Sequence, residues 1–452
     1  MRPPTVRFLG GVREIGGNKI LVEDGPDRIL FDFGPSFDPR REEYYFDFLQ
    51  PRSTSPVKDL LEFDLIPWLD GLYSPEALGG MEERYTEPSV HAVFVSHAHA
   101  DHAGYLRYID PAIPVYTSAG TRKILESNRA TNPSLNYGDH PWKTLSPGSA
   151  VRVGSIEVVP YPVDHSVPYA TGFLVRTGAG SLAYTGDFRR HGPRAALTTR
   201  FLSAAAAERP AGLIIEGTRA GPDPRRSLSE EGVRKELDRL LAATPGLALV
   251  SCYPRDVDRI RTLHAAAQDA GRTLVVPAKA AFLLQSLQGD DELPVPRLGQ
   301  DPYLRVYRRS KKRLFKWEQP LLDEAIDAEE VHRRGKELLL LLDLFQFAEL
   351  NDLRPEPGTP FVRSMSEPFS EEDVNDHVLR NWLEHFDLRL HQMHASGHCS
   401  GPELAEVCRE VNARAVFPVH TEHPEAFASG PGRFCPPTKG DRYRIETGEV
   451  ER

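Results

Sequence analysis

Short apolar runs, interrupted by Gly, Pro and Asp, dominate the chain from residue 6 to about residue 187. Runs rich in β-branched and aromatic residues and bounded by turn residues are typical of short strands, and their spacing favours a largely antiparallel sheet or sandwich. Helical stretches intervene, so the predicted class is mixed α/β. The predicted strands cover residues 6–9, 19–22, 29–31, 93–95, 115–117, 156–159 and 172–175.

After residue 218 the apolar positions recur with helical spacing instead. A capping box at 227–230 is predicted to open a helix with one apolar face. A strand at 247–250, a helix and a second strand at 274–276 follow. This βαβ order predicts a parallel, doubly wound sheet whose ligand-facing loop lies at residues 251–255.

The change of pattern suggests an inserted domain. It begins near residue 235 and ends beyond the Pro-rich stretch at 354–360, which divides the chain into residues 1–235, 236–386 and 387–452. Residues 35–88 are charged and punctuated by prolines, and we interpret them as a loop-rich lid or flap.

Composition narrows the class of protein. With 452 residues, 40% of them hydrophobic, the chain is long enough for two or three domains. The absence of an 18-residue apolar run, or of an apolar N-terminal core, predicts a cytoplasmic protein without a membrane span. Four cysteines without a CxxC pair indicate neither a disulfide framework nor a zinc knuckle. The net charge of −10 gives no global attraction to nucleic acid.

One local segment has the opposite charge. Residues 305–316 hold seven lysines and arginines, with Tyr307, Phe315 and Trp317 among and beside them. Cations that meet phosphates, together with rings that stack on bases, suit a groove that follows a polynucleotide strand. A solvated basic surface is the competing interpretation, and the sequence does not decide between the two.

Four candidate metal ligands stand within six residues, directly after the predicted strand at 93–95: His97, His99, Asp101 and His102. Imidazole and carboxylate groups suit a borderline divalent ion such as zinc. His97 and His99 could bind one ion while Asp101 and His102 face a second, as in two-metal hydrolases. A polar loop with satisfied histidines is the alternative, but so dense a set argues against it.

Further candidates follow other predicted strands. His165, Asp187, Glu216 and His420 each stand at the end of an apolar run. Residues 394–401 form a loop of small residues and histidines that opens a helix, and unpaired N–H groups at such a place can hold an anion. Each candidate is weak alone, and it is their recurrence in this order that points to one site.

In this order the motifs resemble those of the metallo-β-lactamase superfamily and, within it, the β-CASP nucleases. The segment at 9–18, Leu-Gly-Gly-Val-Arg-Glu-Ile-Gly-Gly-Asn, resembles the start of ribonuclease J. The resemblance implies an α/β fold, an αββα metallo-β-lactamase sandwich with an inserted parallel α/β β-CASP domain at 236–386. The matching positions are Asp32, the stretch 97–102, His165 and Asp187 for the superfamily, and Glu216, His398 and His420 for the β-CASP group.

The resemblance also implies a metal site with two zinc ions per chain, or manganese in their place. Two such ions would activate a shared water for attack on phosphorus. The implied ligands are His97, His99 and His165 for one ion and Asp101, His102 and His420 for the other, with Asp187 bridging both and Asp32 orienting ligands from behind.

The same resemblance assigns catalytic roles. Asp101 would orient the water or take its proton, and His398 would protonate the leaving oxygen or hold the phosphate, with Glu216 fixing the tautomer of His398. The substrate phosphate is then expected at Ser396, Gly397, His398 and Ser400.

The function predicted from these residues is a zinc-dependent ribonuclease that cleaves single-stranded RNA as a 5′ to 3′ exonuclease, an endonuclease or both. A nuclease that processes DNA ends, a non-catalytic nucleic-acid-binding subunit and a small-molecule hydrolase are the alternatives. Glu216 departs from ribonuclease J, which usually has Asp at that motif. The oligomeric state is left open.

Overall fold

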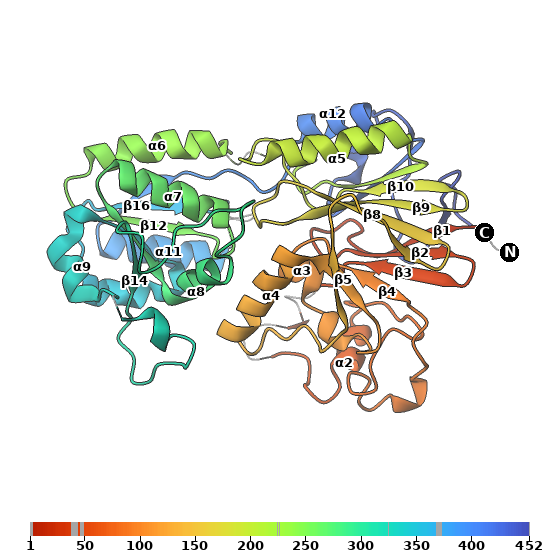
Figure 1. The fold of residues 1–452 in the computed structure, drawn as a ribbon, viewed down its shortest axis with the longest axis horizontal. Helices are drawn as coiled ribbons and strands as arrows, with labels where there is room; N and C mark the ends of the chain where they lie inside the picture. The colour runs from red at the N-terminus through yellow and green to blue at the C-terminus, as the bar shows by residue number, and fades with distance from the viewer. Residues whose placement is uncertain are drawn as a thin grey trace.

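The computed structural model describes residues 3–37, 44–45, 49–223, 225, 227–323, 325–367 and 373–451. These residues form two lobes, one with two facing sheets and the other built around a third sheet (Figure 1). The first sheet has seven strands, in the spatial order β20 (Arg442–Arg444), β1 (Thr5–Gly10), β2 (Lys19–Asp24), β3 (Asp27–Phe31), β4 (Ala92–Phe94), β5 (Val115–Ser118) and β6 (Trp142–Leu145).

The second sheet also has seven strands, and both sheets are half antiparallel and half parallel. Strands β3 to β6 in the first sheet and strands β10, β11, β18 and β19 in the second pair in parallel. The prediction of a largely antiparallel sheet for residues 6–187 was therefore wrong for β3 to β6, because periodicity shows only burial and not strand direction. The spatial order is β19 (Arg433–Phe434), β18 (Ala415–Val419), β11 (Gly212–Glu216), β10 (Gly180–Tyr184), β9 (Thr171–Thr177), β8 (Ile156–Pro162) and β7 (Val151–Val153).

Aromatic side chains fill the space between the two facing sheets. The ring of Phe31 lies 5.5 Å from that of Phe94 in its own sheet, and 5.1 Å and 5.6 Å from Phe173 and Tyr184 in the other. Such pairs add about 0.5–1.5 kcal/mol each beyond the area that they bury. This buried layer packs the two sheets face to face.

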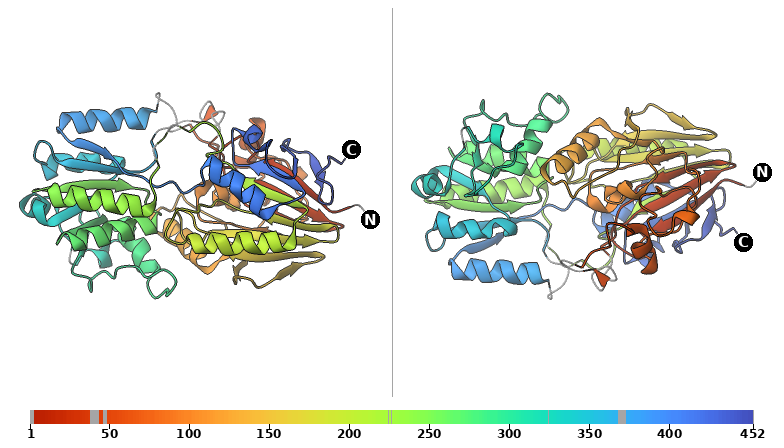
Figure 2. Two further views of the ribbon diagram at one scale, coloured as in Figure 1. Left: turned by 90° about the horizontal axis from the view of Figure 1, so that it is seen from above. Right: turned by 90° about the horizontal axis from the view of Figure 1, so that it is seen from below.

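Helices cover the outer faces of the paired sheets, so the lobe is an αββα sandwich, as predicted. Helices α5 and α12 share a buried cluster with the second sheet, and α4 packs on the first sheet at β5 (Figure 2). The described α-helices are α2 (Pro56–Glu62), α3 (Ala100–Ala103), α4 (Ala119–Thr131), α5 (Ala195–Glu208), α6 (Glu230–Ala243), α7 (Val257–Asp269), α8 (Ala278–Ser286), α9 (Ala328–Arg334), α10 (Leu350–Leu353), α11 (Val374–His385) and α12 (Gly401–Val411).

The third sheet is parallel throughout, which confirms the predicted parallel α/β insertion. Helices α6, α7 and α8 share a buried cluster with one face of the sheet, and α9 and α11 share another with the opposite face. Alternation along β12 explains this, since Val250 joins the first cluster and Leu249 the second. The six strands lie in the order β14 (Leu304–Tyr307), β13 (Thr273–Pro277), β15 (Leu338–Leu341), β12 (Ala248–Cys252), β16 (Pro360–Ser364) and β17 (Arg389–Gln392).

Two sequence predictions concern the start of α6 and the boundaries of this lobe. The capping box at 227–230 is wrong, because the N-cap of α6 is Ser229, whose hydroxyl accepts the N–H of Gly232 at 3.1 Å. The carboxylate of Glu230 instead enters a buried ion-pair network. The division of the chain at 235 and 386 stays a prediction, and we note that β17 of the third sheet lies just beyond the second of these boundaries.

The described residues of the 35–88 segment pack onto the protein core. Helix α2 buries Leu60, and the chain after it buries Ile66, Leu72 and Leu78 in the cluster that also covers the first sheet. A lid that moves freely is therefore the wrong interpretation for residues 49–88, whose apolar positions the proline-rich composition had obscured. Residues 38–43 and 46–48 of the predicted lid lie outside the described residues.

None of the helices among the described residues is long and apolar enough to cross a membrane. The four cysteines, all described, are buried free thiols without a disulfide.

Candidate metal centre

Strand direction brings the candidate ligands together. Strands β3 and β4 run parallel, as do β10, β11 and β18, and β8 has the same direction because it is two antiparallel steps from β10. Loops that follow parallel strands meet at the carboxyl edge of a sheet. Residues from both ends of the chain therefore converge at one edge of the sandwich.

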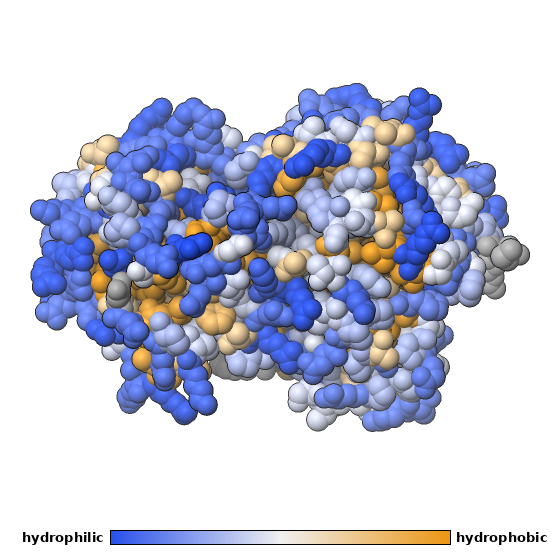
Figure 3. Space-filling model, in the orientation of Figure 1, coloured by the Kyte–Doolittle hydropathy of each residue, from blue (hydrophilic) through white to orange (hydrophobic). Residues whose placement is uncertain are grey.

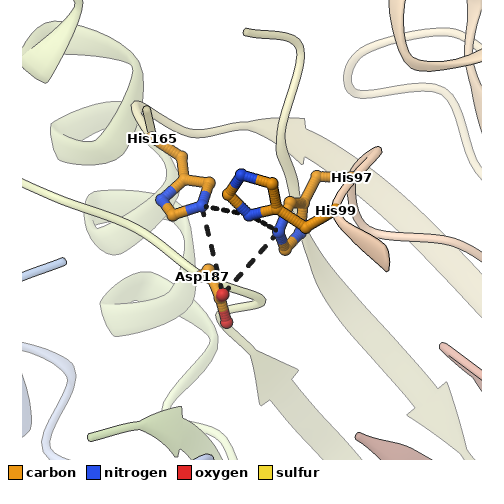
Figure 4. Close-up of side chains that lie close together, drawn as sticks. All are labelled: His97, His99, His165 and Asp187. Carbon is orange, nitrogen blue, oxygen red and sulfur yellow. Dashed lines mark hydrogen bonds and ion pairs between the residues drawn. The ribbon is translucent and has the colours of Figure 1, made fainter. Parts of the chain in front are cut away.

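The first ligand cluster consists of His97, His99, His165 and Asp187, and their ligand atoms all lie within 4.8 Å of one another (Figure 4). Nδ1 of His99 lies 3.0 Å from Nε2 of His97 and 3.2 Å from Nε2 of His165. Oδ2 of Asp187 is 3.7 Å and 4.0 Å from the same two Nε2 atoms. Three imidazoles and one carboxylate thus point at a common centre.

The second cluster consists of Asp101, His102, Asp187 and His420, and it meets the same 4.8 Å limit. Nε2 of His102 lies 3.2 Å from Oδ2 of Asp187 and 3.4 Å from Oδ2 of Asp101. Nε2 of His420 lies 3.1 Å from Oδ2 of Asp101 and 3.5 Å from Oδ2 of Asp187. Asp187 belongs to both clusters, as the sequence predicts for a bridging ligand.

The donor set fits divalent metal ions. Nε2 of His102 and Oδ1 of Asp187 are buried and have no hydrogen-bond partner among the described residues. A buried polar atom without a partner is costly, and a bound cation would relieve that cost. Histidine nitrogen and carboxylate oxygen are typical ligands of zinc and of manganese, so the residues present suit either ion.

The two clusters differ in their proton affinity. Burial lowers the pKa of His97 and His165 well below the usual range and that of His99 to about 4. Burial also opposes the charged forms of His102 and His420, but the nearby carboxylates of Asp187 and Asp101 outweigh it and raise both pKa values. Without metal, the second cluster therefore holds protons more tightly than the first.

Asp32 lies behind the second cluster, where the sequence placed it. Its left-handed backbone (φ 56°) turns the carboxylate inward, and its Oδ2 accepts bonds from Nδ1 of His102 at 2.9 Å and from the hydroxyl of Tyr184 at 2.6 Å. Its Oδ1 accepts the N–H of Ser96 at 2.7 Å. Asp32 thereby fixes the tautomer of His102 and leaves Nε2 of that ring free for a metal ion.

Two other candidate ligands, His97 and His420, are oriented by hydroxyl groups that were not predicted from the sequence. Nδ1 of His97 lies 3.0 Å from the hydroxyl of Ser96, and Nδ1 of His420 lies 2.9 Å from that of Thr218. Ser96 and Thr218 adjoin predicted motifs, so adjacency was the available signal. Tyr184 gave none, because a tyrosine near the end of an apolar strand usually belongs to the core.

His398 stands at the opening of the site with Glu216 behind it. Its Nδ1 lies 3.2 Å from Oε1 of Glu216 and 3.1 Å from the hydroxyl of Thr218. Its side chain is 18% exposed, whereas that of Glu216 is fully buried. The ring lies 5.0 Å from the His165 ring, so His398 is the accessible imidazole beside the two clusters.

The predicted phosphate loop is only partly open to a ligand. The N–H of His398 donates to the hydroxyl oxygen of Ser396 at 3.1 Å, and the carbonyl of Gly397 lies 2.6 Å from Nδ1 of His165. At Ser400, however, both the N–H and the hydroxyl donate to the carboxylate of Glu403 at 2.8 Å. The donor groups of Ser400 are therefore taken, and a phosphate role stays a prediction for Ser396, Gly397 and His398.

A buried ion-pair network, also missed in the sequence, ties the clusters to the third sheet. Arg189 donates to Asp164 at 3.0 Å, to Glu230 at 3.3 Å and to the carbonyl of Ser396 at 3.4 Å. Arg259 of α7 donates to the same Glu230 at 2.7 Å. Both arginines are fully buried, so Glu230 bridges two charges that have no access to water.

Three of the seven basic side chains at 305–316 form ion pairs with carboxylates that lie outside this segment. Arg308 pairs with Asp327 at 2.9 Å, Arg309 pairs with Glu349 at 3.0 Å, and Lys311 pairs with Glu318. The exposed side chains of Lys312, Arg313 and Lys316 have no ion pair or hydrogen bond with any described residue. The predicted polynucleotide groove therefore keeps fewer free cations than the sequence suggested.

Comparison with known proteins supports the motif assignments. The model of a beta-lactamase superfamily domain matches residues 67–225, and that of a Zn-dependent metallo-hydrolase RNA specificity domain matches residues 385–429. The chain is similar to Ribonuclease J of Thermus thermophilus, with 27% identity over 92% of this chain and 67% of that protein. It is also similar to Ribonuclease J of Sinorhizobium meliloti, with 26% identity over 92% of this chain and 68% of that protein.

A solved structure agrees over the whole chain. The crystal structure of a protein of unknown function from Enterococcus faecalis superposes with a TM-score of 0.79 at 26% identity and covers 100% of both chains. The predicted resemblance is thereby confirmed.

Proposed function

Because this chain belongs to the metallo-β-lactamase superfamily and is ribonuclease J-like, we propose that it is a zinc-dependent ribonuclease that hydrolyses the phosphodiester bonds of single-stranded RNA. The observation that carries the proposal is the pair of ligand clusters that share Asp187. Asp187 and the other six ligands would hold two metal ions, with zinc preferred to manganese. The cleavage is 5′ to 3′ exonucleolytic, endonucleolytic or both.

Bound divalent ions would supply Lewis acidity, which lowers the pKa of water and neutralises charge on the phosphate. The chain's own residues do the rest. Asp101, whose Oδ2 lies 3.1 Å from Nε2 of His420, orients the attacking water and takes its proton. His398 donates a proton to the leaving oxygen from Nε2, because Glu216 and Thr218 engage Nδ1.

The direct test uses metal-loaded protein with single-stranded RNA and DNA of one sequence, each 3′-labelled and each carrying either a monophosphate or a hydroxyl at its 5′ end. Cleavage of RNA is expected, and the pattern of labelled products separates the exonuclease from the endonuclease. Faster cleavage of DNA would favour the DNA-end alternative. Binding without cleavage of either polymer would favour the non-catalytic subunit and contradict the proposal. A cytoplasmic location stays a prediction.

His398→Gln should slow cleavage by about 10²–10⁴-fold while the protein keeps its metal. Glutamine retains the polar volume but cannot donate a proton to the leaving oxygen. The measurement is kcat/KM together with zinc content. His423→Gln is the matched control, because that histidine is half exposed and pairs only with Glu425. Loss of zinc in His398→Gln would contradict the assigned role.

The two clusters should lose metal at different pH values. Lowered pKa values mean that His97, His99 and His165 accept protons only in more acidic solution, whereas raised values make His102 and His420 accept them earlier. Protons compete with metal for the same nitrogen atoms. Between about pH 7 and pH 5 the zinc content should therefore fall from two ions to one before it reaches zero. A single concerted loss, measured by metal analysis after dialysis, would disprove this order.

A further inference from the structure

Exposed aromatic side chains gather along one edge of the third sheet. Three of the exposed aromatic side chains among the described residues lie here: Tyr253, Phe315 and Phe345. Tyr253 directly follows β12, Phe345 lies four residues after β15, and Phe315 lies in the segment after β14. Phe345 is 84% exposed and Phe315 is 61% exposed, so neither ring serves the core.

A hollow lies at the carboxyl edge of the same sheet. Its volume is about 340 Å³, and it is lined by Cys252, Pro277, Tyr307 and Leu341, the last residues of four neighbouring strands. Phe345 also lines it. Open parallel α/β sheets bind their ligands outside the carboxyl ends of the strands, where the strand order reverses. This sheet reverses there, since β15 lies between β12 and β13.

The surroundings of the hollow combine stacking faces with positive charge. Trp317 lines the hollow, and its ring is nearly parallel to that of Phe315, with 6.4 Å between centroids and an angle of 8°. Lys279 also lines it, in the first turn of α8. The segment between β14 and α9, which projects below the left-hand lobe in Figure 1, carries hydrophobic and strongly hydrophilic residues side by side in Figure 3. Lys312, Arg313 and Lys316 belong to this segment.

The same edge leads to the metal centre. The Tyr253 ring lies 6.1 Å from that of His394, two residues before Ser396 of the predicted phosphate loop. Two residues further, the side chain of Arg255 donates to Asn128 of α4 at 3.0 Å, a contact that joins the loop after β12 to the other lobe.

We propose that this edge is a stacking path for single-stranded RNA. Bases of the strand stack on Phe345 and Tyr253, and its distal phosphates contact Lys312, Arg313 and Lys316. The inference rests on the proposed ribonuclease function and deepens it. Stacking requires free base faces, which a duplex lacks, so the path selects single strands without reading their sequence.

Phe345→Ala tests the path without disturbing the fold, because the side chain is mostly in solvent. The metal-loaded protein is titrated with a fluorescein-labelled 20-nucleotide RNA that carries cleavage-resistant phosphorothioate linkages. The dissociation constant should rise by about 5- to 100-fold, the range expected for one lost stacking contact. A four-nucleotide RNA too short to reach from the metal centre to Phe345 should be cleaved at an unchanged rate.

Val450→Ala is the matched control, since Val450 is 46% exposed and pairs with Tyr443 at the edge of the first sheet, in the other lobe. It should leave binding of the 20-mer unchanged. Joint replacement of Lys312, Arg313 and Lys316 by glutamine should reduce the slope of log K against log salt by up to about 2. An unchanged salt slope would remove these cations from the path.

Unchanged binding of the 20-mer by Phe345→Ala would overturn the stacking path, as would equal weakening of a duplex of the same length. These outcomes differ from failure of the proposed function. A wild-type protein that binds the resistant RNA through Phe345 but cleaves no unmodified RNA would retain the path and lose the ribonuclease assignment. If Phe345→Ala cleaved RNA as fast as the wild type, the ribonuclease assignment would stand and the stacking path would be lost.

Discussion

Replacing Asp187 by alanine should abolish both metal sites at once and slow hydrolysis by roughly a thousandfold or more. The reason is geometric, because Oδ2 of this one residue lies within 4.0 Å of ligand nitrogens in both clusters. Without it, the five histidines of the two clusters would face one another with one carboxylate fewer to balance a bound cation. The measurements are zinc content per chain and the cleavage rate of single-stranded RNA.

Two other aspartates make the Asp187 result specific. Asp139→Ala should change neither quantity, since its side chain is 85% exposed and pairs only with Arg129. Asp32→Asn should have an intermediate effect, about 10- to 100-fold in metal affinity, because it loses the carboxylate that orients His102 without removing a ligand. If Asp187→Ala retained two zinc ions, the bridging role would be wrong.

Replacing Glu230 by alanine should cost about 3–5 kcal/mol of the free energy of unfolding. The carboxylate is the shared partner of Arg189 and Arg259, both fully buried. Its removal takes the nearest carboxylate from Arg259 and leaves Arg189 with Asp164 as its nearest one, and neither guanidinium has access to water. Carbonyl groups of Ser396 and Ala395 also accept from these arginines, but they carry no charge. Urea titration of the wild type and the variant measures the difference.

Glu231 provides a matched control on the same helix. It is the next residue, 75% exposed, and pairs with Lys235 one turn later, so Glu231→Ala should change stability by less than about 1 kcal/mol. Glu230→Ala should also weaken metal binding at the first cluster, because Arg189 positions Asp164, the neighbour of His165, and Ser396, the neighbour of Gly397. Equal stability losses in the two variants would contradict the buried network.

Much of the candidate site could be predicted because its signals are local. The stretch 97–102 places four ligands within one turn after a strand, where spacing in sequence is nearly spacing in space. His165, Asp187 and His420 could be found because each follows an apolar run, the pattern that a strand end leaves in a sequence. The structure brings these seven residues into two clusters, although their assignment as ligands still awaits metal analysis.

Residues that act across the fold left no such signal. Arg189, Glu230 and Arg259 appear in the sequence as ordinary charged residues of amphipathic segments, which usually face water. The capping box at 227–230 failed for the same reason, because a glutamate three residues after a serine has the right spacing whether it caps the helix or enters the interior. Ser400 had the composition of an anion cradle, yet Glu403 of its own helix occupies the donor groups.

The sequence by itself determined the fold class, the parallel α/β insertion and the positions of the candidate ligands, because apolar periodicity and strand-end residues are properties of short segments. Only the tertiary structure decided that β3 to β6 pair in parallel, as do β10, β11, β18 and β19. It also decided that one buried glutamate joins the lobes and that three exposed rings share a sheet edge. Strand direction, burial of charge and adjacency of distant loops depend on how segments pack, and local spacing does not encode them.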